Sequence, residues 1–488
     1  MQTSSKRDLL KCLAVIHEGR VMFRDGQKEY TAGDLLARIS AFCSVLSAAK
    51  SEDRQILITV GHCFHMLAAV IASWLRGYNA VTVSDVSAET YSFPLADFLI
   101  TDHCMKECAV RNRTVIKTGD IPHTYEQGSV TENIERIRFE ISSMDPSGCR
   151  ITELTSGSTG EPKNIIRSLT SLEQEVTSIY DVIKPENRDE LLVAGTVPCY
   201  HSYGLLFRLL FPLYSGITAW AQMLTYQEEI NSLRSQGKHL ILITSPGFLK
   251  RTDDKKCQCR IRLVLSAGGA LSPGVLAHTL EILQCPMLEI LGSTETGVMA
   301  YRFSETGNEY WNTFPDSKIV PVKEHENEDS ILGFRSRHCD LFNARLDDGT
   351  EIFRTEDVVE MTGPNRFILH GRRSRTVKIE DNRISLDAIE KIMQECQLIK
   401  DAAAVALKSC NREYTAAMVV LSPEGSMIRN SMTPGRFFMH LRSLLTGSVP
   451  AVAVPRSFIF VENLPLTHTG KTDYMTILQE FRHEISAV

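Results

Sequence analysis

The sharpest local signal in the sequence is the stretch at residues 155–163, Thr155-Ser156-Gly157-Ser158-Thr159-Gly160-Glu161-Pro162-Lys163. Glycines let a backbone approach a ligand closely and turn its N–H groups inward, while hydroxyls donate further hydrogen bonds. A lysine at the end of such a loop adds a point charge for phosphate oxygens. This composition predicts a phosphate loop whose natural ligand is a triphosphate.

Two other interpretations of this stretch are weaker. A flexible Ser/Gly linker has a similar composition, but linkers rarely carry the ordered spacing Gly-x-x-Gly-x-Pro-Lys seen here. A Walker loop ends in Gly-Lys-Ser/Thr, whereas this loop ends in Gly160-Glu161-Pro162-Lys163. The sequence therefore disfavours ordinary P-loop chemistry.

The regions around the loop predict an α/β fold. Short apolar runs with the length of buried strands alternate with helical patterns. Several runs end in Gly, Ser, Thr or His clusters, which is where ligand loops lie in open α/β sheets. The runs are Gln55–Val60, Ala80–Val83, Phe98–Thr101, Leu191–Val197, His239–Thr244, Arg262–Ser266 and Met287–Leu291. We expect largely parallel sheets.

The pattern changes towards the C-terminus. Over residues 331–361, short alternating segments surround the turn signal Asp347-Asp348-Gly349, which indicates an antiparallel element. The basic stretch Gly371–Arg375 separates this element from Ser385–Cys396, where the apolar residues line one helical face. We therefore expect a large N-terminal domain over residues 1–373 and a small, mobile α+β domain over residues 374–488.

The composition is that of an ordinary multidomain globular protein. The 488 residues exceed what one hydrophobic core usually supports, and an apolar fraction of 43% with 23% charged residues argues against disorder. No run reaches the about 18 uncharged apolar residues of a membrane span. A net charge of −6 gives no general attraction to nucleic acid or anionic lipid. We expect no nucleic acid or membrane partner, and the 13 scattered cysteines fit reduced thiols in the cytoplasm.

Six further motifs follow the loop in a fixed order. They are Val197–Leu205, Ser266–Ala270, Leu291–Gly297, Arg354–Asp357, Gly371–Lys378 and Leu464–Lys471. Together with the loop, these motifs resemble those of the adenylate-forming superfamily, which comprises acyl-CoA synthetases, peptide-synthetase adenylation domains and luciferases. The matches extend from Thr155 to Lys471, so they cover most of the chain.

The resemblance implies roles for individual residues. The Thr294 hydroxyl would donate a hydrogen bond to an α-phosphate oxygen, and the Glu295 carboxylate would bind Mg²⁺. Asp357 would accept hydrogen bonds from ribose hydroxyls, and Arg372 would support the sugar or the phosphate; an ordinary surface ion pair is the alternative. Lys471 would bridge the substrate carboxylate and the α-phosphate while charge develops on phosphorus.

Further positions complete the expected site. Gly268 and Gly269, with Ala270, resemble the turn that packs against adenine, although a plain tight turn has the same composition. His201, between two tyrosines, resembles the family's gate beside the acyl pocket, and a structural histidine is the alternative. The expected catalytic residues are Lys471, Thr294, Glu295 and His201. The expected nucleotide-binding residues are Thr155, Ser156, Gly157, Ser158, Thr159, Gly160, Lys163, Gly268, Gly269, Ala270, Ser293, Asp357, Arg372 and Lys378.

The resemblance also implies an activity. An AMP-forming acid–thiol ligase would use ATP and Mg²⁺ to make an acyl-adenylate, release pyrophosphate, and pass the acyl group to a phosphopantetheine thiol. The sequences of residues 155–163, 201–208 and 377–386 look most similar to those of synthetases of aryl-polyene and related polyketide clusters. Those synthetases are thought to load acyl carrier proteins in secondary metabolism. Residues 199–205 contain no aspartate for an α-ammonium, so an aryl or fatty acid without an α-amine is expected.

The chain departs from the family pattern at four positions. Ser374 stands where members often carry a hinge aspartate, and Asp381 stands where a glycine lines the pantetheine tunnel. Glu356 replaces the glycine of a Thr-Gly-Asp triplet, and Leu291 replaces a tyrosine that stacks on adenine. Asp381 favours a carrier protein over coenzyme A as the acceptor. An acyl-CoA ligase, a stand-alone adenylase and a catalytically silent binding or scaffold homologue remain alternatives.

Overall fold

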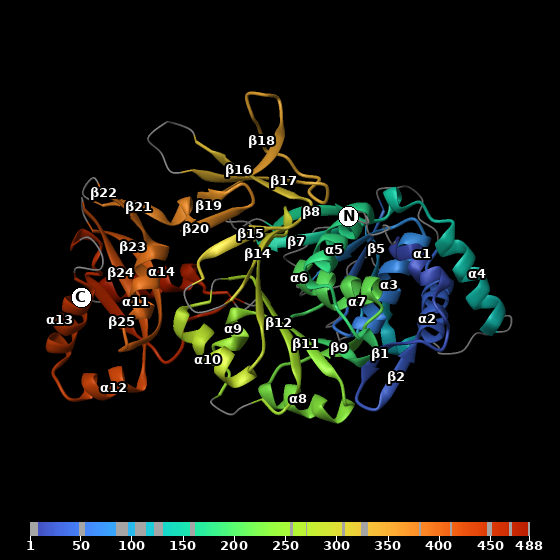
Figure 1. The fold of residues 1–488 in the computed structure, drawn as a ribbon, viewed down its shortest axis with the longest axis horizontal. Coiled ribbons are helices and arrows are strands. Elements are labelled where there is room, and N and C mark those ends of the chain that lie inside the picture. Colours follow the sequence, from blue (N-terminus) through green and yellow to red (C-terminus); the bar gives the residue numbers. More distant parts are fainter. Residues whose placement is uncertain are drawn as a thin grey trace.

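A mostly parallel sheet, a larger mixed sheet and two small C-terminal sheets organise the chain (Figure 1). The computed structural model describes residues 8–47, 54–83, 96–102, 114–121, 130–156, 162–253, 257–269, 271–304, 308–323, 330–379, 382–409, 412–446, 451–467 and 471–486. The helices before residue 300 are α1 (Leu9–Val15), α2 (Ala32–Val45), α3 (Cys63–Leu75), α4 (Val130–Ser142), α5 (Leu169–Ile183), α6 (Ser202–Gly204), α7 (Phe211–Ser215), α8 (Gln227–Ser232), α9 (Pro246–Leu249) and α10 (Pro273–Leu283), with a π-helix at Leu205–Leu210. Among the described helices, none is both long enough and apolar enough to cross a membrane.

The smaller, mostly parallel sheet carries the phosphate loop at its edge. Its strands are β3 (Gln55–Thr59), β4 (Asn79–Thr82), β5 (Ala96–Thr101), β6 (Thr114–Lys117), β7 (Arg150–Ser156) and β8 (Pro162–Ser168). They lie in the order β6-β5-β3-β4-β7-β8, and only β8 runs antiparallel to its neighbour. The residues of the loop therefore connect β7 to β8.

The larger sheet has a block of parallel strands, with antiparallel pairs on both sides of it. Its strands are β1 (Val21–Asp25), β2 (Lys28–Thr31), β9 (Leu191–Gly195), β10 (Thr218–Met223), β11 (His239–Thr244), β12 (Ile261–Ala267), β13 (Met287–Ser293), β14 (Gly297–Phe303), β15 (Tyr310–Thr313), β16 (Ser317–Val322), β17 (Ile331–Ser336), β18 (Ala344–Arg345), β19 (Glu351–Gly363) and β20 (Arg366–Arg372). The order is β16-β17-β19-β20-β15-β14-β13-β12-β11-β9-β10-β1-β2, with β18 on β19. Strands β1, β10, β9, β11, β12 and β13 are parallel, and pairing is antiparallel from β13 to β16.

The predicted parallel sheets and the antiparallel element are confirmed. Each of the seven predicted apolar runs coincides with a strand to within two residues at either end. The Asp347–Gly349 turn joins β18 to β19, as the pattern of residues 331–361 predicts. The α/β class is therefore readable from the sequence because buried parallel strands are short, apolar and bounded by turn residues.

Alternating side chains divide the large region between two cores. On one face of the larger sheet, Val193 and Ile241 belong to the core shared with the smaller sheet and with α2, α3 and α5. On the other face, Leu192 and Leu240 pack with α8, α9 and α10. Both faces are buried because helices cover each of them, as a parallel sheet requires.

The C-terminal region has two sheets of its own, β21-β22 and β23-β24-β25, and its own cores. Its strands are β21 (Thr376–Ile379), β22 (Asn382–Ser385), β23 (Ile399–Ser409), β24 (Arg412–Leu421) and β25 (Ser457–Phe460), and its helices are α11 (Leu386–Glu395), α12 (Pro423–Asn430), α13 (Pro434–Leu445) and α14 (Tyr474–Ser486). The predicted helix is confirmed, with Ser385 as its N-cap and Cys396 as its C-cap. Helices α11 and α13 cover one face of the β23-β24-β25 sheet, while α14 covers the other.

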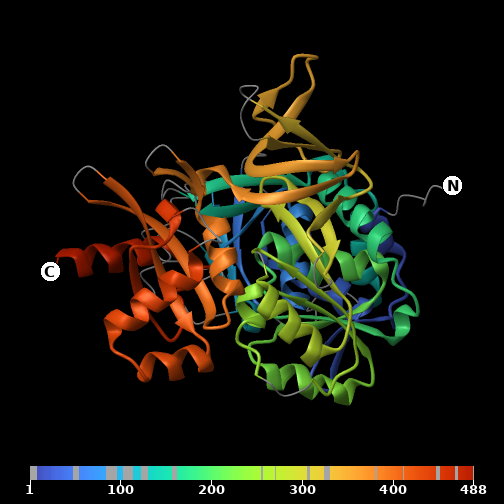
Figure 2. The same ribbon diagram turned by 60° about the vertical axis from the view of Figure 1, so that its left-hand side comes forward.

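The C-terminal region lies against the large region through a few polar contacts. Figure 2 shows its sheets and helices to one side of the rest of the molecule. Lys250 Nζ, after α9, lies 2.8 Å from Asp401 Oδ2 on β23. A second ion pair joins Lys391 of α11 to Glu309. Lys471, before α14, also lies near Gly268 at the end of β12.

Candidate functional site

The phosphate-loop hairpin is in place, although its tip is outside the described residues. Backbone pairing joins Thr155 to Lys163 and Ser156 to Pro162, so the hairpin is closed up to the loop. Of the predicted loop residues, Gly157, Ser158, Thr159 and Gly160 lie outside the described part of the chain. The side chains of Thr155, Ser156 and Lys163 lie outside it as well.

A tight turn between β13 and β14 presents Thr294 and Glu295. Ser293 and Gly297 pair across the turn, and the buried Thr296 closes it by hydrogen-bonding to Ser293, with Oγ1 3.2 Å from the Ser293 amide. The Ser293 hydroxyl in turn accepts from the Thr296 amide at 3.2 Å. The turn thus fixes its own geometry and leaves Thr294 and Glu295 to project from it.

The predicted gate lies between β9 and the π-helix, where the chain packs very closely against residues 197 and 198. A Cβ built on Gly204 would lie 1.9 Å from the Pro198 carbonyl oxygen, so only glycine fits there. The buried guanidinium of Arg208 donates to the Val197 carbonyl at 2.7 Å. His201 lies beside Tyr200, with ring centroids 4.9 Å apart. The π-helix that follows is a form often found at functional sites.

A buried carboxyl group connects this loop to the β13–β14 turn. Ser202 Oγ lies 2.5 Å from Glu153 Oε2 and 3.1 Å from Thr294 Oγ1. Burial raises the pKa of Glu153 to about 7, against the lowering effects of Ser202 and Arg167. The motif pattern does not single out Glu153, although a glutamate flanked by apolar and hydroxyl-bearing residues in the strand before a phosphate loop is a signal in itself.

Asp357 and Arg372 face each other across β19 and β20. They are paired in register, and Arg372 Nε lies 3.6 Å from Asp357 Oδ1. Burial raises the pKa of Asp357, while the charge of Arg372 and a hydrogen bond with Thr355 lower it. The Arg372 amide donates to Asp387 Oδ2 of α11 at 2.9 Å, so this arginine touches both regions of the chain.

Lys471 reaches from the C-terminal region into the same place. A Cβ built on Gly268 would lie 3.8 Å from Lys471 Cε, and Gly268 has a φ of +91°, which favours glycine. Burial and then the charge of Arg372 lower the pKa of Lys471, while Glu295 raises it. Lys471 keeps exposed surface, so its ammonium group is surrounded but still reachable. The residue thus lies among Gly268, Arg372 and Glu295.

The structure therefore brings together most of the predicted residues that it describes. Thr294, Glu295, Lys471, Arg372, Asp357 and Gly268 form one continuous group, and Ser293 lies in the turn that carries it. Gly269 follows Gly268 at the end of β12, where its Cβ position faces Pro246. Ala270 and Asp381 lie outside the described residues, and for Lys378 only the backbone, in β21, is described.

The donor set suits a metal ion that arrives with a nucleotide. Among the described residues, no group of three or more His, Cys, Asp or Glu side chains forms a metal cage. Mg²⁺ usually keeps its waters and binds through one or two carboxylates plus substrate phosphates. The single carboxylate of Glu295, next to Thr294, fits that mode.

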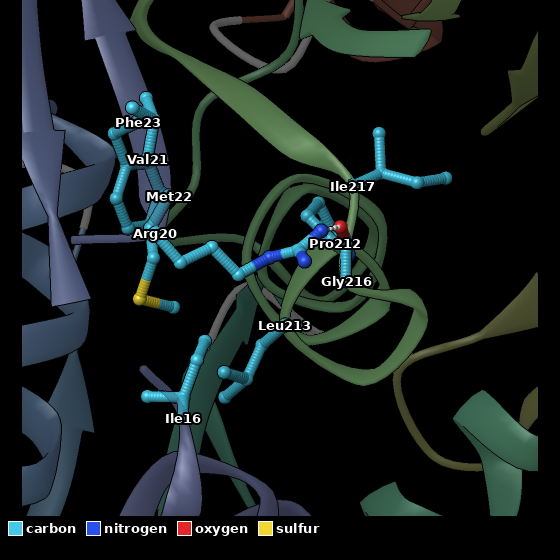
Figure 3. A pocket seen from close by; sticks show the side chains of 9 residues that line it. All are labelled: Ile16, Arg20, Val21, Met22, Phe23, Pro212, Leu213, Gly216 and Ile217. Atoms are coloured by element: carbon cyan, nitrogen blue, oxygen red, sulfur yellow. Dashed lines mark hydrogen bonds between the residues drawn. The ribbon is translucent and has the colours of Figure 1, made fainter. Parts of the chain in front are cut away.

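A separate small pocket lies beside β1 and α7. Figure 3 shows Arg20 extending across it, with its guanidinium bonded to the Gly216 carbonyl. Its other lining residues are Ile16, Val21, Met22, Phe23, Pro212, Leu213 and Ile217. None of the predicted site residues lines this cavity, so it is separate from the group around Lys471.

Comparisons with known proteins identify the family and the fold. The profile of the AMP-binding enzyme family matches residues 14–322, and that of the AMP-binding enzyme C-terminal domain matches residues 388–471. The dimodular nonribosomal peptide synthase of Bacillus subtilis (strain 168) is 25% identical over 359 residues, which are 65% of this chain and only 14% of that much longer protein. The 4-coumarate–CoA ligase of Cereibacter sphaeroides is 25% identical over 347 residues, covering 70% of this chain and 74% of the ligase. The solved benzoate CoA ligase of Burkholderia xenovorans LB400 has the same fold, with a TM-score of 0.74, 17% identity, and coverage of 96% of this chain and 98% of that one.

Proposed function

Because the chain belongs to the AMP-binding enzyme family, we propose that it activates a carboxylic acid with ATP and passes the acyl group to a phosphopantetheine thiol. The observation that carries the proposal is the position of Lys471. A lysine from the C-terminal region lies next to Gly268, Arg372 and Glu295, which come from three separate elements of the large region. A family resemblance in sequence alone does not require this convergence.

In the first step, a carboxylate oxygen attacks the α-phosphorus of ATP, the bond to the bridging oxygen breaks, and pyrophosphate leaves. Thr294 donates a hydrogen bond to an α-phosphate oxygen, and Lys471 neutralises the charge that develops around phosphorus. Asp357 accepts hydrogen bonds from the ribose hydroxyls. Glu295 holds Mg²⁺, which shields the phosphate charge when bound.

In the second step, a thiolate attacks the acyl carbonyl carbon and AMP leaves. The small domain, residues 374–488, rotates about Ser374 so that Lys471 withdraws and the Lys378 region approaches. The relatives include a protein named as a CoA ligase and another named as a peptide synthase, and this supports activation of an acid as the shared step. Asp381, in place of the tunnel glycine, favours a carrier-bound pantetheine over free coenzyme A.

Acid-dependent release of pyrophosphate from MgATP tests the first step. A panel of aryl and fatty acids without an α-amine should give release, and adding a phosphopantetheine-bearing carrier protein should then yield a thioester. If a thioester forms with coenzyme A but not with the carrier protein, the protein is an acyl-CoA ligase. Release without any thioester would indicate a stand-alone adenylase, and no release with any acid would contradict the proposal.

Lys471→Ala tests the assignment of the lysine. Pyrophosphate exchange should fall by about 10²- to 10³-fold, as expected when a charge that stabilises the transition state is removed. Lys408→Ala, which removes an exposed lysine from β23 of the same region, is the matched control and should retain exchange. Undiminished exchange in Lys471→Ala would exclude a role for this lysine in adenylation.

A further inference from the structure

Three side chains form a short hydrogen-bonded chain beneath the proposed α-phosphate position. Ser202 Oγ contacts Glu153 Oε2 at 2.5 Å and Thr294 Oγ1 at 3.1 Å. A serine hydroxyl carries one hydrogen, so Ser202 donates to only one of these neighbours at a time. The direction of hydrogen-bond donation along Glu153, Ser202 and Thr294 can therefore be reversed.

The protonation state of Glu153 sets that direction. An ionised Glu153 only accepts, so Ser202 donates to it, and the Thr294 hydrogen must point back to Ser202 if the second bond is kept. A protonated Glu153 donates to Ser202, Ser202 then donates to Thr294 Oγ1, and the Thr294 hydrogen is free to point away. A phosphate oxygen only accepts, so it needs the second arrangement.

We propose that Glu153 is a positioning residue whose protonated form turns the Thr294 hydroxyl towards the nucleotide through Ser202. The inference rests on the proposed function, which places an α-phosphate oxygen at Thr294. It goes beyond that function because it assigns a proton-dependent role to a residue outside the six motifs and the phosphate loop.

The surroundings of Glu153 favour its neutral form. The residue is 4% exposed, and its Oε1 has no hydrogen-bond partner in the part of the chain that the structure describes. A negative charge there would be buried with one oxygen uncompensated, which is costly. On the neighbouring strands, Thr82 and Ile165 are its register partners, and neither carries a charge.

Two charged groups act on Glu153 from β8 and α5. Arg167 lowers the pKa of Glu153 and Glu175 raises it, and both effects are smaller than that of burial. Arg167 is engaged elsewhere, because its Nη2 donates to Glu175 Oε2 at 2.8 Å. From the β13–β14 turn, Glu295 follows Thr294, and Lys471 faces Glu295. With a pKa of about 7, Glu153 changes its charge close to neutral pH.

Equilibrium binding of MgATP, without acid substrate, at about pH 6 and about pH 8 tests the inference. Glu153→Gln is always neutral and keeps an N–H donor for Ser202, so it mimics the protonated form. The ratio of the wild-type Kd to the Glu153→Gln Kd should rise about tenfold between the two pH values, because the competent fraction of the wild type falls by that factor. Titration of the nucleotide and of Lys471 occurs in both proteins and cancels in the ratio.

Two further variants separate the relay from direct charge repulsion between Glu153 and phosphate, and from a general effect of removing a buried carboxyl group. Glu390→Gln removes another buried carboxyl group whose pKa burial raises to about 7, but it lies in the C-terminal region, so it should keep the wild-type pH dependence. Ser202→Ala leaves the Glu153 charge in place but removes the hydrogen-bonded link to Thr294. Its Kd for MgATP should therefore rise between the two pH values no more than that of Glu153→Gln. This variant also serves if Glu153→Gln does not fold.

Each outcome of these measurements is decisive. A ratio that stays constant with pH, or a rise that disappears in Glu390→Gln, would overturn the relay. A wild-type pH dependence in Ser202→Ala would also overturn it, because simple repulsion between Glu153 and phosphate would then suffice. Absence of MgATP binding in all four proteins would instead contradict the proposed function, on which the relay depends.

Discussion

Replacing Gly204 by alanine should damage the site without changing any polar group. Gly204 has φ −71° and ψ −40°, a right-handed helical conformation in which alanine is normally preferred to glycine. The added Cβ would lie 1.9 Å from the Pro198 carbonyl oxygen and 2.7 Å from its carbonyl carbon. Since both atoms belong to the backbone, a rotamer change cannot relieve the contact, and the loop must move by about 1 Å or more.

The expected loss of stability follows from that displacement. Overpacking of a closed site costs about 1–3 kcal/mol, and a clash with backbone lies at the upper end, at about 3 kcal/mol. Ser202, two residues away, would move with the loop, and its contact with Thr294 is already 3.1 Å long. A displacement of about 1 Å at a reacting centre can cost about 10²-fold in rate, so pyrophosphate exchange should fall by about that factor.

Urea unfolding and pyrophosphate exchange of Gly204→Ala, alongside Gly274→Ala, would check both numbers. Gly274 lies in α10 and nothing lies within 4 Å of its Cβ position, so alanine should be neutral or stabilise by a few tenths of a kcal/mol. Wild-type stability and exchange in Gly204→Ala would refute the steric argument. A loss of stability without a loss of exchange would mean that the loop position does not control the chemistry.

Two further predictions concern buried ion pairs. Arg167→Met should lower the free energy of unfolding by about 3–5 kcal/mol, because it leaves the Glu175 carboxylate, which is 2% exposed, without its partner. Arg345→Met breaks an equally short pair whose side chains are 68% and 51% exposed, and should change stability by less than about 1 kcal/mol in the same urea experiment. Burial alone would raise the pKa of Asp316, but His338 and the neighbouring hydroxyls hold it below its ordinary value. Asp316 thus contributes stability that is present above about pH 4 and is lost as the pH falls through the folded-state pKa, so the difference in unfolding free energy between wild type and Asp316→Asn should shrink in acid.

The sequence predicts most of the frame of the site and little of its interior. Turn-bounded apolar runs predict strands such as β11, because a buried strand must be short and apolar on both faces. The relation between Lys471 and Gly268 is not a local property, since about 200 residues separate them along the chain. The Glu153 carboxyl group is hidden from motif reading for the same reason: its role depends on Ser202 and Thr294, which reach it from other elements.

The proposed pivot at Ser374 lies between two arginines whose side chains contact different regions of the protein. Arg372 still pairs with Asp357 in the larger sheet, although its amide also bonds to α11. Three residues later, Arg375 forms ion pairs with Asp387 and Glu390 of α11. Its guanidinium also lies 3.9 Å from the centre of the Tyr474 ring. The proposed rotation would therefore carry Arg375 with the small domain.

Rotation between these two arginines would break the hydrogen bond from the Arg372 amide to Asp387 and two ion pairs between the regions. Among the ion pairs of the described residues, Lys391–Glu309 is more than half exposed on both sides, so its rupture costs less than about 1 kcal/mol. The Lys250–Asp401 ion pair is less exposed. Both side chains lie at the border of the two regions, however, so water would solvate them again on separation. Because the cores of the small domain are its own, withdrawal of Lys471 exposes little apolar surface. In the proposed mechanism, the contacts that hold Lys471 in place for the first step would thus be weak enough to break before the second.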